Sequence, residues 1–434
     1  MDKNKYSPAL SRHVILQETI RQVVRSQREE LESLEPGIER EALRDVPLDI
    51  PFAVILSGIR RCGKSTLLRQ LAKELRSYAY LNFEDPRFVG LSPPDFPRLE
   101  KALEEEYGPT DHYLLDEVQA MRGWETFVRA ELDRGKRFVI TGSNASLLGT
   151  PLGTKLTGRH LRKELFPFSY AEYLKSRETA PGPRSLKEYL MEGGFPSYLR
   201  YHRSEILREL FMDILSRDIL AHHPVRGSTN LRELATYLMS NPAKEASLRT
   251  LSGLFHLRSQ TTASRFVAYL EDSYLLQTIP VYDPSLKRRL RNPRKSYAID
   301  TGLAAANSLS FSEDRGGALE NSVFLHLRRS FREIFYFKGK GVCDFVVRDR
   351  GKVHSVIQVC YELTETNQER ELQGLGEALD RLDIAEGTIV TLDQEDSLCV
   401  GNRRAKVVPA WKWMITRGER PSRPDEGTPA RTGK

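Results

Sequence analysis

The stretch AVILSGIRRCGKSTLLRQLAKEL, from Ala53 to Leu75, decides the fold of the first part of the chain. An apolar run opens it, the spacing G-x-x-x-x-G-K-[ST] follows from Gly58 to Ser65, and an amphipathic helical pattern closes it. A glycine-rich loop between a strand and a helix directs backbone N–H groups and the positive end of the helix at phosphate oxygens. The stretch therefore predicts a P-loop, in which Lys64 reaches the outer phosphates of ATP and Ser65 holds Mg²⁺. The predicted nucleotide-contacting residues are Gly58, Ile59, Arg60, Arg61, Cys62, Gly63, Lys64, Ser65 and Thr66.

An acidic pair follows the apolar run of HYLLDEVQ, residues 112–119. A carboxylate at the end of a buried strand can join the Mg²⁺ shell, and this is the role predicted for Asp116 beside Ser65. The adjacent Glu117 is placed to orient and polarise the attacking water. The alternative is an acidic pair that begins a surface helix. Together with the P-loop, the pair predicts ATP hydrolysis and not binding alone.

Two further positions extend this set. The stretch FVITGSNASLL, residues 138–148, ends a predicted strand in small polar residues, and Asn144 or Ser143 could contact the γ-phosphate or the lytic water, although the same residues also suit an ordinary turn. Arg159 comes later, in KLTGRHLRKEL, where an arginine could reach the γ-phosphate of a neighbouring subunit in a homo-oligomer. The alternative for Arg159 is a solvated arginine in a basic helix.

The composition of the whole chain excludes several classes of protein. A length of 434 residues suggests two to four domains, and we expect three. No apolar run has the length needed to span a bilayer and the first residues lack the apolar core of a signal peptide, so we expect a cytoplasmic protein without a membrane partner. The four cysteines lie far apart, which disfavours disulfides and a zinc site. A net charge of +7 permits an anionic partner without requiring one.

Strand-like and helical patterns alternate from about residue 49 to 166, which predicts an α/β fold with a parallel sheet and helices on both faces. Helical patterns precede and follow this region. A later helical unit, residues 229–276, is followed by QTIPVYDPSLKRRLRNPRKSYAID, whose two β-like ends flank a basic turn. Helices followed by such a hairpin predict a winged helix. The final residues are polar and rich in Pro and Gly, which predicts a disordered tail.

The chain resembles AAA-type ATPases of bacteria and archaea that carry a C-terminal domain of unknown function. The resemblance covers roughly residues 50–410 and rests on GIRRCGKST, LNFEDPRF (81–88), LLDEVQAMRGWE (114–125), ITGSNASLL (140–148) and EGGFPSYL (192–199). It implies an AAA+-like core, a winged helix and a final α/β domain similar to restriction endonucleases. The expected domains are 1–48, an N-terminal helical extension; 49–166, the ATPase core; 167–227, a helical lid; 228–312, the winged helix; 313–410, the degenerate endonuclease-like domain; and 411–434, the tail.

The winged helix raises the question of what the ATPase acts on. Its second helix would begin at Ser259–Thr262 and, in DNA-binding versions of the fold, would enter the major groove. The following turn carries the densest basic run in the chain, which suits sequence-independent phosphate contacts. Winged helices also dock proteins, and basic runs are often only solvated. The predicted DNA contacts are Arg258, Gln260, Thr262, Arg265, Lys287, Arg288, Arg289, Arg291, Arg294 and Lys295.

In the final domain, the resemblance points to a nuclease site that has lost parts. Restriction-type nucleases place an acid and then an acid-x-lysine pair around Mg²⁺. Here the corresponding residues are Glu320, Asp344, Gln358 and Cys360. Glutamine is a weak neutral ligand and cysteine cannot replace an ammonium group, so we expect no cleavage unless Glu362 or Lys352 substitutes.

Three functions from different classes follow from these patterns. The first, which we favour, is an ATP-hydrolysing motor or switch that acts on DNA. The second is a nucleotide-gated regulatory switch whose winged helix docks a protein. The third is an ATP-gated, metal-dependent nuclease.

Overall fold

The computed structural model describes residues 15–142, 156, 158–225, 227–310 and 314–415. The chain divides into two compact units, Met1–Phe166 with Asp272–Tyr274, and Pro167–Glu271 with Leu275–Lys434. No helix in the described part of the chain is both long and apolar enough to cross a bilayer.

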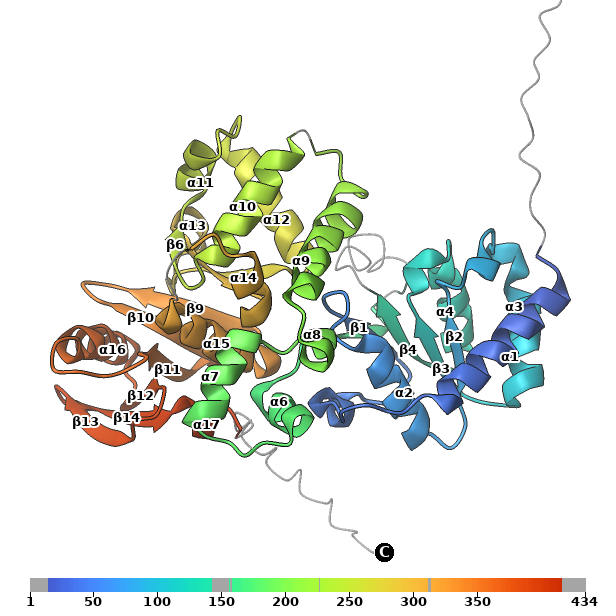
Figure 1. Ribbon diagram of the computed structural model, residues 1–434, viewed down its shortest axis with the longest axis horizontal. Helices are drawn as coiled ribbons and strands as arrows, with labels where there is room; N and C mark the ends of the chain where they lie inside the picture. The colour runs from blue at the N-terminus through green and yellow to red at the C-terminus, as the bar shows by residue number, and fades with distance from the viewer. Residues whose placement is uncertain (1–14, 143–155, 157, 226, 311–313, 416–434) are drawn as a thin grey trace, which may run out of the picture. The chain divides into compact units, whose positions relative to one another are not determined.

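A parallel sheet forms the centre of the first unit, as the alternating pattern predicted (Figure 1). Its order is β2-β3-β4-β1-β5, so the chain passes from β1 to β2 at one edge of the sheet, then adds β3 and β4 between them, and last adds β5 on the other side of β1. All five residues of β1 are buried, because helices cover both faces of a parallel sheet. The strands are β1 (Ala53–Ser57), β2 (Ala79–Asn82), β3 (His112–Asp116), β4 (Arg137–Gly142) and β5 (His160–Glu164).

Helices of the first unit bury their apolar stripes against this sheet. Leu99 and Leu103 of α3, for example, are buried in the same core as Ile20 and Val23 of α1. The helices are α1 (Gln17–Ser33), α2 (Lys64–Glu74), α3 (Phe96–Tyr107) and α4 (Trp124–Asp133), with the short 3₁₀ turns η1 (Glu41–Asp45), η2 (Pro86–Phe88), η3 (Pro93–Asp95) and η4 (Val118–Ala120).

Strand β5 corrects the interpretation of KLTGRHLRKEL as a basic helix. His160–Glu164 pairs in parallel with β1, at the edge of the sheet. An edge strand can leave its side chains partly in water, and none of the five residues of β5 is buried. The apolar signal that identifies an inner strand is therefore missing from its sequence.

The second unit begins with helices that surround the EGGFPSYL motif. Asp300 is buried, and its carboxylate accepts hydrogen bonds from the backbone N–H groups of Gly194 (2.6 Å) and Leu303 (2.7 Å). A Cβ on Gly193 would lie 2.2 Å from Asp300 Oδ1, so the motif needs glycine to admit the carboxylate. The helices on either side of it are α6 (Tyr170–Arg177), α7 (Pro183–Glu192), α8 (Pro196–Tyr201), α9 (Ser204–Asp213) and α14 (Thr301–Asn307).

Asp300 gives the protein a predicted pH dependence of stability. Burial raises the pKa of Asp300 to about 6, although the N–H groups of Gly194, Leu303 and Gly302 oppose the shift. The folded protein thus binds this proton more tightly than the unfolded chain. The free energy of unfolding should fall by about 3 kcal/mol as the pH rises from about 4 to about 6, and this contribution should not change further at higher pH. Urea unfolding of the wild type and of Asp300→Asn across this range tests it. A difference between the two proteins that does not vary with pH would contradict the assignment.

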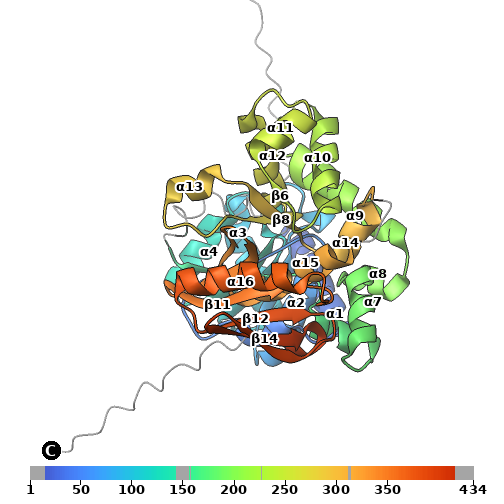
Figure 2. The same ribbon diagram turned by 90° about the vertical axis from the view of Figure 1, so that its left-hand side faces the viewer.

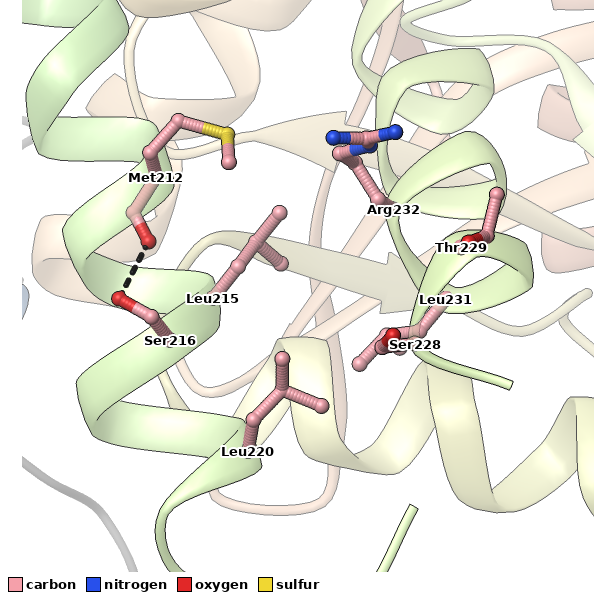
Figure 3. A pocket seen from close by; sticks show the side chains of 8 residues that line it. All are labelled: Met212, Leu215, Ser216, Leu220, Ser228, Thr229, Leu231 and Arg232. Carbon is pink, nitrogen blue, oxygen red and sulfur yellow. Dashed lines mark hydrogen bonds between the residues drawn. The ribbon is translucent and has the colours of Figure 1, made fainter. Parts of the chain in front are cut away.

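Helix α9 continues as a π-helix, η6 (Ile214–Leu220), whose Ser216 hydroxyl donates a 2.8 Å hydrogen bond to the Met212 carbonyl (Figure 3). Figure 3 shows the small pocket between this segment and the start of α10 (Ser228–Ser240). Its volume is about 150 Å³. Ligand pockets usually enclose roughly 300–1,000 Å³, so this one is too small for a nucleotide.

Four helices and a three-stranded sheet make up residues 228–298, the main part of the region of the predicted winged helix. Ser259 accepts a hydrogen bond from Thr262 N, which caps the second helix of the pair as the sequence predicted. The basic turn differs from the expectation in one respect, because it contains a short helix. The elements are α10, α11 (Leu248–Leu254), α12 (Gln260–Asp272), β6 (Glu245–Ala246), β7 (Leu276–Ile279), α13 (Leu286–Arg291) and β8 (Arg294–Ala298), with sheet order β6-β8-β7.

The last part of the second unit is a mixed sheet of order β13-β14-β12-β11-β10-β9. Helix α16 lies across one face of it (Figure 2), where its Leu375 packs in one core with Val346 of β10. The neighbouring Phe345 faces the other side, toward Phe324 of α15. The elements are α15 (Arg315–Ser330), β9 (Glu333–Lys338), β10 (Val342–Asp349), β11 (Lys352–Val359), α16 (Gln368–Leu382), β12 (Glu386–Thr391), β13 (Asp396–Val400), β14 (Arg403–Pro409) and α17 (Ala410–Trp413).

Candidate nucleotide site and basic surface

The predicted P-loop connects β1 to α2 at the carboxyl edge of the parallel sheet. Gly58 and Gly63 both have positive φ angles, of 157° and 102°. A Cβ on Gly58 would lie 2.1 Å from the carbonyl oxygen of Leu165, so a larger residue would displace the loop from β5. Helix α2 begins at Lys64, which directs the positive end of the helix at the loop.

Lys64 is held inside this loop. Its Nζ donates hydrogen bonds to the carbonyl oxygens of Gly58 (3.1 Å) and Ile59 (3.3 Å), and the residue is only 4% exposed. The loop therefore curves around a fixed positive charge. Cys62, in the same loop, is buried, and burial raises the pKa of its thiol, so it remains protonated at neutral pH.

The acidic pair lies at the end of β3, next to the loop. Asp116 is its last residue and is buried, which raises the pKa of its carboxyl group, while hydrogen bonds with Thr141 and Ser65 lower it. Thr141 of β4 donates from its hydroxyl to Asp116 and accepts from the backbone N–H of Glu117 (3.0 Å). The sheet thus brings together the three predicted residues Ser65, Asp116 and Glu117, since the carboxyl ends of parallel strands meet at one edge.

Hydroxyl and carboxylate oxygens are the donors that Mg²⁺ prefers, so Ser65 and Asp116 fit a magnesium ion. Glu117 has a left-handed backbone conformation, with φ of 49°. Such a conformation is uncommon for a residue other than glycine and occurs often at functional sites.

Two buried residues beside the loop were missed by the sequence analysis. Thr141 lies within the quoted FVITGSN stretch, but its contact with β3 depends on strand order. Arg40 comes from the N-terminal extension, and its guanidinium donates to the carbonyl oxygens of Cys62 (2.6 Å) and Phe166 (2.7 Å). Arg40 holds the P-loop in place through the carbonyl of Cys62. No local pattern in the sequence distinguishes it from a surface arginine.

Asn144 and Ser143 lie outside the described residues. Arg159 directly precedes β5. Its carbonyl accepts from Ala53 N (3.1 Å), and its side chain forms an ion pair with Asp133. Ala53 is the first residue of β1, whereas the P-loop follows the last residue of β1. Arg159 therefore lies at the amino-terminal ends of the strands, and the P-loop of its own chain lies at their carboxyl ends.

Most of the predicted DNA contacts are exposed or half-buried residues of the second unit. Arg258, Thr262 and Arg265 line a cleft of about 650 Å³ together with His256. Arg288 forms an ion pair with Asp283 (3.5 Å), an acid just outside the basic run. We use the name "basic surface" for the following exposed or half-buried residues: Arg258, Gln260, Thr262, Arg265, Lys287, Arg288, Arg289, Arg291 and Arg294.

Lys295 does not belong to this surface, which corrects its prediction as a DNA contact. It is only 5% exposed, and its Nζ bridges Glu320 (2.9 Å) and Asp344 (2.7 Å). Two of the four residues of the predicted nuclease remnant, Glu320 and Asp344, are therefore brought together by a lysine that the sequence placed among the DNA contacts. Of the expected substitutes, Glu362 is exposed, and Lys352 is exposed at the far end of β11. Gln358 hydrogen-bonds Glu371 (2.6 Å). Cys360 is buried and its thiol faces the carbonyl of Glu362.

Comparison with known proteins identifies the class. Residues 51–174 match the family model of an AAA domain, and residues 183–314 match a domain of unknown function (DUF8612). Together with the parallel sheet and the loop geometry, the first match defines an AAA+-like P-loop ATPase fold. The second match covers helices of the predicted lid and the region of the predicted winged helix, not the last sheet.

Two curated relatives match over most of their length. The uncharacterized protein MJ1544 of Methanocaldococcus jannaschii is 32% identical over 407 residues, which are 86% of this chain and 91% of that protein. An uncharacterized protein of Haemophilus influenzae is 29% identical over 347 residues, 74% of this chain and 86% of that protein. The chain belongs to the same family of AAA-domain P-loop ATPases as MJ1544.

Solved structures match more weakly. The AMPPCP-bound DnaA of Aquifex aeolicus has a TM-score of 0.28 at 15% identity, covering 58% of this chain and 88% of that chain. Cdc6p of Pyrobaculum aerophilum has a TM-score of 0.23 at 13% identity, covering 63% and 90%. TM-scores of this size carry no argument about function.

Proposed function

We propose that the protein is a Mg²⁺-dependent ATPase that hydrolyses ATP while associated with DNA. The observation that supports hydrolysis best is the contact of Thr141 with both Asp116 and the N–H of Glu117. It fixes the carboxylate of Asp116 and the backbone of Glu117 beside the loop that contains Lys64. Ser65 and Asp116 would hold Mg²⁺, which would neutralise charge on the phosphates. Glu117 would orient the attacking water.

The proposed DNA contact is supported by charge and exposure. The stretch Gln260–Leu270 of α12 contains no acidic residue, and its Arg265 lines the same cleft as Arg258, which precedes the helix. The exposed Lys287, Arg288 and Arg291 lie on α13, in the turn between β7 and β8. A winged helix presents its second helix and its wing on DNA, and these two elements carry the basic surface. Phosphate contacts of this kind bind without sequence preference.

Replacing Lys287, Arg288 and Arg291 by alanine should weaken DNA binding to a similar extent for all sequences. The logarithm of the DNA association constant falls linearly with the logarithm of the salt concentration. Each lost phosphate contact should make this slope less steep by about 0.9 for duplex DNA. Basal ATP hydrolysis should persist, because the substituted residues lie in a different unit from the P-loop. Gel-shift titrations at several salt concentrations, beside ATPase assays with and without duplex, measure both effects.

The matched control replaces three exposed basic residues outside the basic surface, Arg184, Arg350 and Lys352, and changes the net charge equally. An unchanged affinity and salt slope in the first variant would remove DNA from the proposal. The protein-docking switch would then be the better hypothesis.

We also propose that Arg159 acts on the γ-phosphate bound by a neighbouring subunit of a homo-oligomer. Arg159 and the P-loop of the same chain lie at opposite ends of the strands. This separation supports a role of Arg159 in the nucleotide site of a neighbouring subunit over a role in the site of its own chain. Mixing Arg159→Ala with Lys64→Ala protein should restore part of the ATPase activity through mixed interfaces. A mixed oligomer, verified by mass, that shows no such recovery would contradict the role.

A further inference from the structure

A buried ion cluster connects three elements of the second unit that are distant in sequence. Lys295 extends from β8 in the region of the predicted winged helix, Glu320 from α15 and Asp344 from β10. The Lys295 ammonium lies 2.9 Å from Glu320 Oε1 and 2.7 Å from Asp344 Oδ1. The side chains are 7%, 13% and 9% exposed, respectively, so water screens these charges only weakly.

Two further donors reach these carboxylates, one at the same Glu320 oxygen that Lys295 contacts and one at the other oxygen of Asp344. The Tyr297 hydroxyl donates to Glu320 Oε1 (2.8 Å), and the Val359 N–H donates to Asp344 Oδ2 (2.9 Å). Burial alone would lower the pKa of Lys295, but the carboxylates of Asp344 and Glu320 raise it above its ordinary value. The ammonium therefore stays charged at neutral pH.

These residues do not fit the Mg²⁺ ion that the resemblance to restriction endonucleases implies. Mg²⁺ requires near-octahedral oxygen ligands at about 2.0–2.1 Å. An ion at that distance from both Glu320 Oε1 and Asp344 Oδ1 would occupy the space in which the Lys295 ammonium already touches the same two atoms. Gln358, at the position of the second acid, donates its amide to Glu371 and accepts from Asp344 N.

We infer that the Lys295 ammonium takes the place of a divalent cation between Glu320 and Asp344, so that this cluster joins the predicted winged helix to the last sheet instead of holding metal. The inference is independent of ATP hydrolysis. Three neighbouring contacts support the joining role. Tyr282 N donates to the carbonyl of Tyr336 on β9 (2.6 Å), the ring of Tyr297 stacks on Phe324 (4.2 Å), and Asn321 exchanges two hydrogen bonds with the backbone of Ala298 (2.7 and 2.9 Å).

The test measures Mn²⁺ binding to the full-length chain without nucleotide, by titration calorimetry and by the electron paramagnetic resonance of free Mn²⁺. All proteins carry Asp116→Asn, which removes the carboxylate proposed to hold metal at the nucleotide site. Adding Lys295→Ala should create one Mn²⁺ site, seen as roughly tenfold or more tighter binding. Adding Glu320→Gln to that variant should abolish the site again. Lys352→Ala, which removes an exposed lysine of the same unit, should bind Mn²⁺ no better than the parent.

Two results would overturn the inference. One is a folded Lys295→Ala variant that binds Mn²⁺ no better than the parent. The other is a parent that already binds Mn²⁺ and loses it on Glu320→Gln or Asp344→Asn. If Lys295→Ala does not fold, the second comparison decides alone, because it uses chains that keep Lys295. Mn²⁺ binding unaffected by both acid substitutions supports the inference.

Discussion

Glu117→Gln protein is expected to bind ATP as the wild type does and to hydrolyse it 10²- to 10⁴-fold more slowly. The magnitude is that of losing a positioned general base, about 10²–10⁴ in rate. Glutamine keeps the shape of the side chain and the backbone contact of residue 117 with Thr141, so the P-loop should be undisturbed. Only the charge that polarises the water is lost. Equilibrium ATP binding and steady-state phosphate release measure the two effects separately.

Lys64→Ala should instead act mainly on ATP binding. It removes the ammonium held at the loop carbonyls and should weaken ATP binding by roughly 100-fold or less, since a hydrogen bond to a charged group contributes about 1.5–3 kcal/mol. Glu104→Gln and Lys73→Ala change exposed residues of the same charge on α3 and α2 and should leave both quantities unchanged. Wild-type turnover in Glu117→Gln would refute the assignment of Glu117.

Arg40→Met is expected to destabilise the first unit by about 3–5 kcal/mol. The guanidinium is buried and donates to the carbonyls of Cys62 and Phe166, so its removal leaves both oxygens without this donor. Each lost hydrogen bond from a charged group costs about 1.5–3 kcal/mol, and unsatisfied buried carbonyls add to that. Because Cys62 precedes Gly63 in the P-loop, ATP binding should weaken as well. Urea unfolding followed in the presence and absence of ATP measures both.

Arg40→Lys separates charge from geometry. Lysine keeps the charge but lacks the planar fork that reaches two carbonyls at once, so it should recover only part of the stability. Arg44→Met, at an exposed position of η1, is the matched control and should change stability by less than about 0.5 kcal/mol. Wild-type stability in Arg40→Met would show that the buried contacts contribute little.

The nucleotide site could be predicted from the sequence because its signals are local. The Gly58–Ser65 spacing lies within eight residues, and Asp116 and Glu117 directly follow a buried apolar run. Strand β5 could not be recognised, because an edge strand with half-exposed side chains has no apolar pattern. The contacts of Thr141 and Arg40 join segments that are distant in the sequence. The spacing of residues along the sequence does not show which distant segments become neighbours in the fold.

Lys295 shows the same limit most clearly. It stands in a run of basic residues from Lys287 to Lys295, and the sequence gives no reason to separate it from Arg294 or Arg291. Its partners lie 25 and 49 residues further along the chain. Only the pairing of β8 with its neighbours and the packing of α15 show that this one lysine is buried and the others are not. The prediction that Lys295 contacts DNA therefore fails because of its burial and its two carboxylate partners, which only the fold shows.

The contact between the EGGFPSYL motif and Asp300 has a consequence for how this family can evolve. A Cβ at Gly194 would lie 2.3 Å from the carbonyl oxygen of Phe168, and one at Gly302 would lie 2.0 Å from that of Glu192. Neither obstacle is a side chain that could mutate in compensation, because both are backbone atoms. At Gly193 the obstacle is the Asp300 carboxylate itself. Gly193 in addition has φ of 71° and ψ of −162°, a backbone conformation open essentially to glycine alone, so glycines 193, 194 and 302 should all persist whatever happens to the aspartate.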